Sequence, residues 1–269
     1  MPVYWFALGQ INNINSNKAV LVFIILHFLV YPASNGYNSF MDKDTESIGG
    51  VKNPLPATKQ LYHATIILDI AGLIAGLYVG YSFTILLFFY IMASKSYSYT
   101  GIRLKKFPII SYVIAIIFQG AVVYAMVYNS CGNAVSQYLL PLPAIASSLF
   151  VGSLYPLTQI YQHVQDEASN IRSISIMLGY RGTFLLSFSM GFLGLGITAF
   201  FFSTNLELDR FLVLLVCMFP SVIFLLRWNI KVRNNKEAAS FKNSMMMNWI
   251  TATGSNLAFI IILIIKNKF

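Results

Sequence analysis

Charge is scarce in this sequence. Only 10% of its 269 residues are charged and only nine are acidic, whereas ordinary soluble domains carry roughly 25% charged residues. So few charges could not cover the surface of a soluble protein of this length, and the composition therefore indicates a multi-pass membrane protein. The net charge is +9, but no soluble region carries it, so we expect no nucleic-acid partner.

Cysteine is almost absent as well. Cys131 and Cys217 lie far apart, so their spacing predicts neither a disulfide nor a metal site. The opening stretch MPVYWFALGQ lacks the basic flank and the small-residue cleavage site of a signal peptide.

Apolar runs make up most of the chain. A membrane-spanning helix needs about 20 mostly apolar residues. Gly76 and Gly80 predict a turn between two nearly continuous runs. We expect an all-α membrane protein, a single domain over 1–269, with eight helices in the bilayer at 18–37, 61–79, 81–95, 109–128, 137–160, 182–203, 209–228 and 246–265.

Basic residues gather on one side of these predicted helices. Most of the 18 lysines and arginines lie in the segments 41–60, 95–107, 163–181 and 227–242. Basic loops usually face the cytoplasm. We therefore expect these segments, with the acidic clusters around Asp42 and Asp166, at the cytoplasmic face of a bacterial inner membrane.

The first acidic cluster has helical spacing. Asn38, Asp42 and Glu46 are four residues apart, so a helix through them places all three on one face, and Asp44 adds another acid. Like charges at this spacing repel unless a cation lies between them, and such oxygen ligands suit Mg²⁺ with a bound phosphate. A solvated loop with incidental acids is the alternative.

A second polar cluster lies in the segment QIYQHVQDEASNIR. Gln162, Asp166 and Asn170 recur at helical spacing, with Glu167 beside Asp166. A charge cluster at a helix end would look similar, but two clusters on one predicted face favour a functional role.

The loop SKSYSYTGIRLKKFP places Tyr97 before Arg103, Lys105 and Lys106. Basic groups near carboxylates can hold a metal-bound diphosphate and stabilise its charge as it leaves. An ordinary cytoplasmic loop is the alternative.

Asp69 stands apart because it lies within the apolar run ATIILDIAGL. An acid inside a membrane is costly and often functional. Alternatively, Asp69 packs inside the protein as a hydrogen-bonding partner of His63 or Tyr62.

These segments resemble the UbiA superfamily of intramembrane prenyltransferases. Asn38-x-x-x-Asp42-x-x-x-Glu46 resembles the first aspartate-rich motif of the family, Asp166-x-x-x-Asn170 lies where the family has its second, and SYSYTGIRLKK resembles its basic loop. Glu46 keeps the charge of the aspartate that the family has there. Asn170 does not, and the residue after it supplies no carboxylate.

The resemblance implies a bundle of about nine helices that transfers a prenyl group from an isoprenoid diphosphate to an aromatic or lipophilic acceptor. It implies Mg²⁺ held by both clusters: Asp42 and Asp166 as catalytic ligands, with Asn38, Glu46 and Asn170. It implies diphosphate binding by Tyr97, Arg103, Lys105, Lys106 and Arg172, and gives weaker support to Asp44, Gln162, Glu167 and Asp69.

Two alternatives to a prenyltransferase stay open. A terpene cyclase on the same fold would suit the altered second motif. A transporter or non-catalytic protein would more naturally place its polar groups at the membrane midplane. The segment MPVYWFALGQ resembles only the C-terminal half of the family's first helix, so we expect the gene to encode further apolar residues upstream.

The charge distribution predicts the topology. Cysteines introduced beside Lys52 and Lys105 should resist an impermeant thiol reagent in intact cells and react after the cells are opened, because both loops are expected to face the cytoplasm. Strong labelling of intact cells at either position would contradict the helix assignment.

Overall fold

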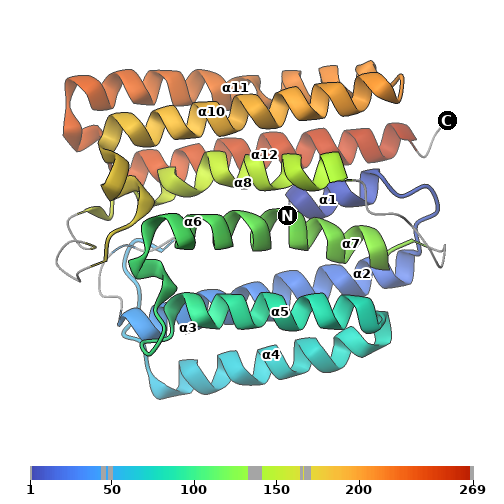
Figure 1. Ribbon diagram of the computed structural model, residues 1–269, viewed down its shortest axis with the longest axis horizontal. Helices are drawn as coiled ribbons and strands as arrows, with labels where there is room; N and C mark the ends of the chain where they lie inside the picture. Colours follow the sequence, from blue (N-terminus) through green and yellow to red (C-terminus); the bar gives the residue numbers. More distant parts are fainter. Residues whose placement is uncertain are drawn as a thin grey trace. The chain divides into compact units, whose positions relative to one another are not determined.

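The computed structural model describes residues 2–43, 47, 51–132, 141–163, 166 and 171–266. Among these residues the only β-type contact is an isolated bridge between Ile14 and Gly132. The chain divides into two compact units (Figure 1). The N-terminal unit contains Gln10–Lys105 and Ala125–Leu139, and the C-terminal unit contains Met1–Gly9, Lys106–Tyr124 and Leu140–Phe269.

The N-terminal unit positions the first acidic cluster. Its first membrane-length rod is continuous and consists of α2 (Ser16–Ile24), the π-helix η1 (Ile25–Val30) and α3 (Tyr31–Asp42), followed by α4 (Lys59–Val79) and α5 (Tyr81–Ser98). Gly80 forms the predicted turn between α4 and α5 with φ 148°, a conformation that favours glycine. Consequently α3 ends, α4 begins and α5 ends at the same side of this unit (Figure 1).

The C-terminal unit is made of longer helices. Gly179 has φ 64° and ψ 178°, so it breaks the first turn and a half of α10 away from the rest of that helix. The elements of this unit are α1 (Pro2–Gly9), α6 (Pro108–Ile116), the π-helix η3 (Ile117–Val122), α8 (Pro141–Gln159), α10 (Ile174–Thr204), α11 (Leu208–Asn234), η4 (Lys236–Ala238) and α12 (Phe241–Lys266). The short helices η2 (Leu104–Lys106) and α7 (Val123–Ser130) span the boundaries between the units.

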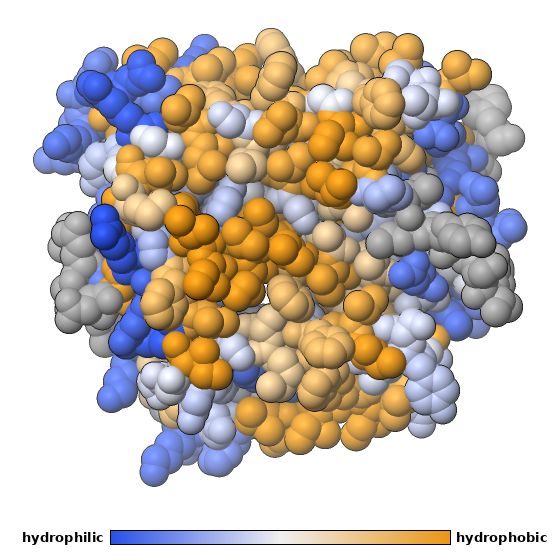
Figure 2. Space-filling model, viewed as in Figure 1, coloured by the Kyte–Doolittle hydropathy of each residue, from blue (hydrophilic) through white to orange (hydrophobic). Residues whose placement is uncertain are grey.

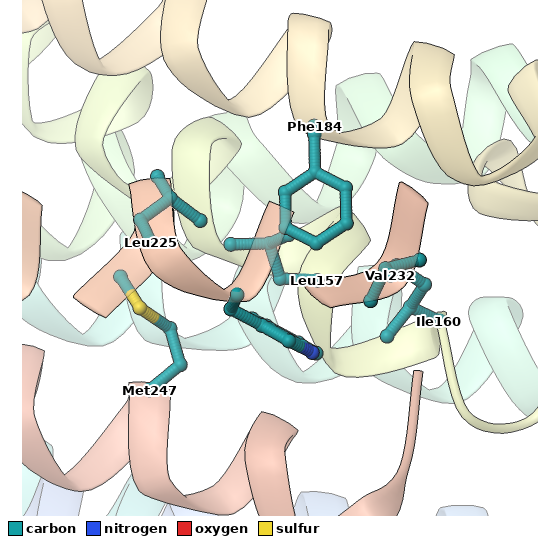
Figure 3. Close-up of a cluster of buried hydrophobic side chains, with 7 residues drawn as sticks. Leu157, Ile160, Phe184, Leu225, Val232 and Met247 are labelled. Atoms are coloured by element: carbon teal, nitrogen blue, oxygen red, sulfur yellow. The ribbon is translucent and has the colours of Figure 1, made fainter. Parts of the chain in front are cut away.

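A buried apolar cluster joins four elements of the C-terminal unit (Figure 3). At its centre the rings of Phe184 and Trp228 meet edge to face with centroids 5.2 Å apart. The indole N–H of Trp228 donates to the carbonyl of Ala238 at 2.7 Å, so its polar atom is satisfied. The cluster consists of Leu157, Ile160, Phe184, Leu225, Trp228, Val232 and Met247.

The outer surface of the helices is apolar, as a bilayer requires. Along α11, Leu212, Val216 and Phe219 are each more than half exposed, and their spacing gives one lipid-facing stripe. Hydrophobic side chains spread over the middle of the helices in Figure 2, whereas hydrophilic ones gather near the helix ends. These features fit a membrane protein rather than a soluble bundle.

Six helices of the described residues are long and apolar enough to cross a membrane: Ser16–Asp42, Lys59–Val79, Pro108–Ser130, Ile174–Thr204, Leu208–Asn234 and Phe241–Lys266. They coincide with six of the predicted spans. The runs predicted at 81–95 and 137–160 correspond to the shorter helices α5 and α8, of 18 and 19 residues. The predicted all-α membrane fold is thus confirmed, while the single domain over 1–269 stays a prediction.

Close backbone contact between α11 and α12 depends on Gly254. A Cβ atom built at this position would lie 2.5 Å from the carbonyl oxygen of Cys217, a backbone atom that cannot rotate away. By contrast, a Cβ at Gly196 in α10 would meet nothing within 4 Å.

Gly254→Ala should therefore lower the thermal unfolding midpoint of the purified protein, because overpacking of this kind costs about 1–3 kcal/mol. Gly196→Ala is the matched control. It should leave the midpoint unchanged or raise it, since alanine favours a helix over glycine by up to about 1 kcal/mol. Equal midpoints for the two variants would contradict the close α11–α12 contact.

Candidate functional site

The last turn of α3 carries the first acidic cluster. Asn38 and Asp42 lie one turn apart on this helix, as their spacing predicts. The helix ends immediately after Asp42, because Lys43 adopts a left-handed conformation with φ 52°. Asp44 and Glu46, the other two acids predicted here, lie outside the described residues.

The basic loop after α5 approaches Asp42 through a tight turn. The backbone N–H of Arg103 donates to the carbonyl of Tyr99 at 2.6 Å, and Arg103 has φ 47°. The following turn of η2 buries Lys105 to 5% exposure and directs its ammonium to Asp42 Oδ1, with which it forms an ion pair. Arg103 Nη2 lies 4.0 Å from the same oxygen. Both cations were predicted to act near carboxylates, and the fold brings them to the same one.

Asn38 is held by a hydrogen bond from α5. The hydroxyl of Ser98, in the last turn of α5, donates to Asn38 Oδ1 at 2.5 Å. An amide oxygen has two lone pairs, so Asn38 can accept this hydrogen bond and still bind a cation. The oxygen atoms of Asn38 and Asp42 are the hard ligands that Mg²⁺ prefers. No group of three or more histidine, cysteine, aspartate or glutamate side chains converges among the residues that the structure describes.

The guanidinium of Arg103 retains a free donor. Its Nε is buried and makes no hydrogen bond within the described part of the chain, although buried donors are nearly always satisfied. An anion bound beside Asp42 would satisfy it. The donor set at this end of the N-terminal unit therefore fits a cation held by oxygen atoms together with an anionic group.

The remaining residues of the predicted basic set are placed as follows. Tyr97 lies in the last turn of α5, and Lys106 ends η2 with an exposed side chain. Arg172 is exposed shortly before α10.

The second cluster belongs to the C-terminal unit. The N–H of Asp166 donates to the carbonyl of Gln162 at 2.8 Å, a helical contact that agrees with the predicted spacing, and the carbonyl of Asp166 accepts from Ile171 at 2.8 Å. Glu167 and Asn170 lie outside the described residues.

A chain of side-chain contacts lies beside this second cluster. The sequence pattern did not predict it. His163 Nε2 is 2.8 Å from the hydroxyl of Ser175, which is 3.0 Å from the hydroxyl of Thr183. Residues eight apart lie about 12 Å apart along an unbroken helix, so the contact between Ser175 and Thr183 depends on the break at Gly179. Gly179 was the available signal, because a glycine ahead of a hydrophobic run can break a helix.

Asp69 also has a different partner from those considered in the sequence. Its Oδ2 pairs with Lys95 Nζ at 2.6 Å, rather than with His63 or Tyr62. Lys95 lies on α5, about one turn further from the Gly80 turn than Asp69. Helical side chains tilt toward the N-terminus of their helix, so the long lysine side chain reaches back to the level of Asp69.

Comparison with known proteins identifies the family of the chain. The model of the UbiA prenyltransferase family matches residues 1–252. No curated protein sequence matches the chain.

Several solved structures share the fold. A UbiA homologue from Aeropyrum pernix K1 has 15% identity and a TM-score of 0.70, with 94% of each chain covered. A UbiA homologue from Archaeoglobus fulgidus bound to DMAPP and Mg²⁺ has 13% identity and a TM-score of 0.66, covering 97% of this chain and 93% of that one. A digeranylgeranylglyceryl phosphate synthase has 19% identity and a TM-score of 0.63, covering 98% and 91%. At these identities the likeness concerns the fold.

Proposed function

Because the chain belongs to the UbiA prenyltransferase family, we propose that it transfers a prenyl group from an isoprenoid diphosphate to an aromatic or lipophilic acceptor within the membrane. One observation carries the proposal. Asp42 ends α3 in contact with both Lys105 and Arg103, so an acid suited to a metal and two cations suited to a diphosphate meet at one helix end.

The reaction breaks one carbon–oxygen bond and forms one bond to the acceptor. The diphosphate leaves with the electron pair of the C1–O bond, and the allylic carbon is captured by a nucleophilic atom of the acceptor, which loses a proton. Arg103 and Lys105 stabilise the negative charge that develops on the leaving oxygen, because fixed cations in a shielded site act strongly on developing charge. An apolar chamber between the helices would exclude water, which would otherwise capture the allylic cation.

A divalent metal fits the oxygen donors of α3. Mg²⁺ bound to Asp42 and Asn38 would draw charge from the diphosphate and lower the barrier to its departure. Each acidic segment would contribute ligands in this proposal, Asp166 from the second. The Archaeoglobus fulgidus homologue, which binds DMAPP with Mg²⁺, supports the choice of metal and donor class.

We also propose that the reaction takes place at the cytoplasmic face of a bacterial inner membrane. The basic segments predict this orientation. A prenyl diphosphate has a charged head and an apolar tail, so acids and bases at a helix end can bind the head while the tail enters the apolar interior.

Asp42→Asn should abolish most Mg²⁺-dependent release of diphosphate from geranyl diphosphate by purified protein with candidate acceptors. The change keeps the side-chain shape and removes the charge that binds metal, so activity should fall by about 100-fold or more, the scale of losing a key electrostatic group. Asp166→Asn should act similarly. Diphosphate release and prenylated product should be measured together, by a phosphate assay and mass spectrometry.

Asp209→Asn is the matched control for these variants. Asp209 lies in the first turn of α11, outside the proposed site, so this variant should keep wild-type activity. An Asp42→Asn/Asp166→Asn double variant with wild-type turnover would eliminate the metal–diphosphate mechanism.

Asn170→Asp separates the prenyltransferase from the cyclase alternative. If the second motif is a weakened form of the family pattern, the added carboxylate should lower the Mg²⁺ concentration needed for half-maximal activity and keep or raise turnover, because Mg²⁺ favours charged oxygen ligands. Impaired turnover, or a cyclised product in the absence of acceptor, would contradict this and favour a cyclase.

A further inference from the structure

A ladder of polar contacts joins α3 to α5 in the N-terminal unit. The contacts follow the two helices toward Asp42, one helical turn or less apart. They are Ser34 Oγ to Ser94 Oγ at 2.5 Å, Lys95 Nζ over the Tyr37 ring at 4.0 Å from its centroid, and Ser98 Oγ to Asn38 Oδ1 at 2.5 Å.

Lys95 supplies the only charge in these three contacts. Lys95 Nζ lies over the ring of Tyr37 and pairs at 2.6 Å with Asp69 on α4. The two charged side chains are shielded, with 15% and 8% exposure, and Tyr37 is 5% exposed. The ammonium group of Lys95 on α5 therefore links three helices, because it contacts α3 through Tyr37 and α4 through Asp69.

We propose that Lys95 and Asp69 form a positioning pair that orients Asn38 and Asp42 for binding of the metal and the diphosphate. The proposal rests on the function proposed above. Tyr37 immediately precedes Asn38, so fixing the Tyr37 ring under Lys95 fixes the rotation of α3 about its axis at the turn that carries the ligands. Asp42 follows one turn later, where α3 ends.

The pair does more than fill space between helices. Apolar side chains could join α4 to α5 equally well, and buried ion pairs replaced by apolar residues often leave stability unchanged or increased. A cation is needed to attract the face of Tyr37, and Asp69 is needed to hold that cation in place. A packing role and a positioning role can be separated by experiment. Packing of the helices requires only that no charge is left unpaired, whereas positioning of Tyr37 requires the cation of Lys95.

Three variants test the pair in purified protein reconstituted in lipid nanodiscs. Lys95→Met leaves the shielded Asp69 carboxyl without its partner, so both the unfolding midpoint and the affinity for geranyl diphosphate with Mg²⁺ should fall. The double variant Lys95→Leu/Asp69→Leu should regain the midpoint, yet bind this probe at least about tenfold more weakly than wild type, the scale on which partners of metal ligands act. Lys95→Arg keeps a cation that can pair with Asp69 and lie over Tyr37. This variant should therefore bind the probe with nearly wild-type affinity.

The control is a second ion pair, in which Arg210 is 15% and Glu207 is 27% exposed. Arg210 and Glu207, at 2.6 Å in the C-terminal unit, are replaced together by leucine, and probe affinity should not change. Wild-type affinity in the Lys95→Leu/Asp69→Leu variant would overturn the positioning role, as would failure of Lys95→Arg to restore affinity while its midpoint is normal. If wild-type protein itself binds no geranyl diphosphate with Mg²⁺, the proposed function fails and this inference falls with it.

Discussion

Every charge buried among apolar helices needs a partner of opposite sign, and this requirement organises the N-terminal unit. Water and counterions are scarce there, so an isolated charge would be very costly. Asp42 is paired with Lys105 and approached by Arg103, and Asp69 is paired with Lys95. Because the partners come from different helices and from the loop after α5, pairing the charges also links those segments.

The same pairing gives the end of α3 its chemical character. Asp42 is paired with Lys105 and lies 4.0 Å from Arg103. A divalent metal and a multiply charged anion can bind here together, because the metal would pair with the carboxylate and the anion would pair with the two basic side chains. The buried, unsatisfied Nε of Arg103 is consistent with such an exchange. The apolar character of the surrounding helices suits the lipophilic tail of the proposed substrate.

The sequence predicted the features that depend on local spacing. The all-α membrane fold followed from the apolar runs, the turn at Gly80 from its position between two of them, and the shared face of Asn38 and Asp42 from a spacing of one helical turn. The family resemblance is confirmed by the match over residues 1–252. The ligand roles of Asn38, Asp42 and Asp166 stay predictions.

Contacts between distant segments were less predictable. The partner of Asp69 depends on the register of the α4–α5 hairpin and on the backward tilt of the Lys95 side chain, neither of which a hydropathy pattern contains. The hydrogen bond from Ser98 to Asn38 depends on the packing of α3 against α5. Glu46 and Asn170, where the chain departs from the family pattern, lie outside the described residues, so their roles rest on the resemblance alone.

The central claim is that a metal ion joins the α3 carboxylate to the diphosphate. Electron–nuclear double resonance with Mn²⁺ in place of Mg²⁺ tests this most directly, because it detects the coupling of the metal to the ³¹P nucleus of a bound phosphate group. We expect this coupling to appear when protein, Mn²⁺ and geranyl diphosphate are combined in membranes, and the protein-bound signal to be lost when Asp42 is replaced by asparagine. A protein-bound Mn²⁺ signal without ³¹P coupling, or one unaffected by the Asp42 change, would contradict it.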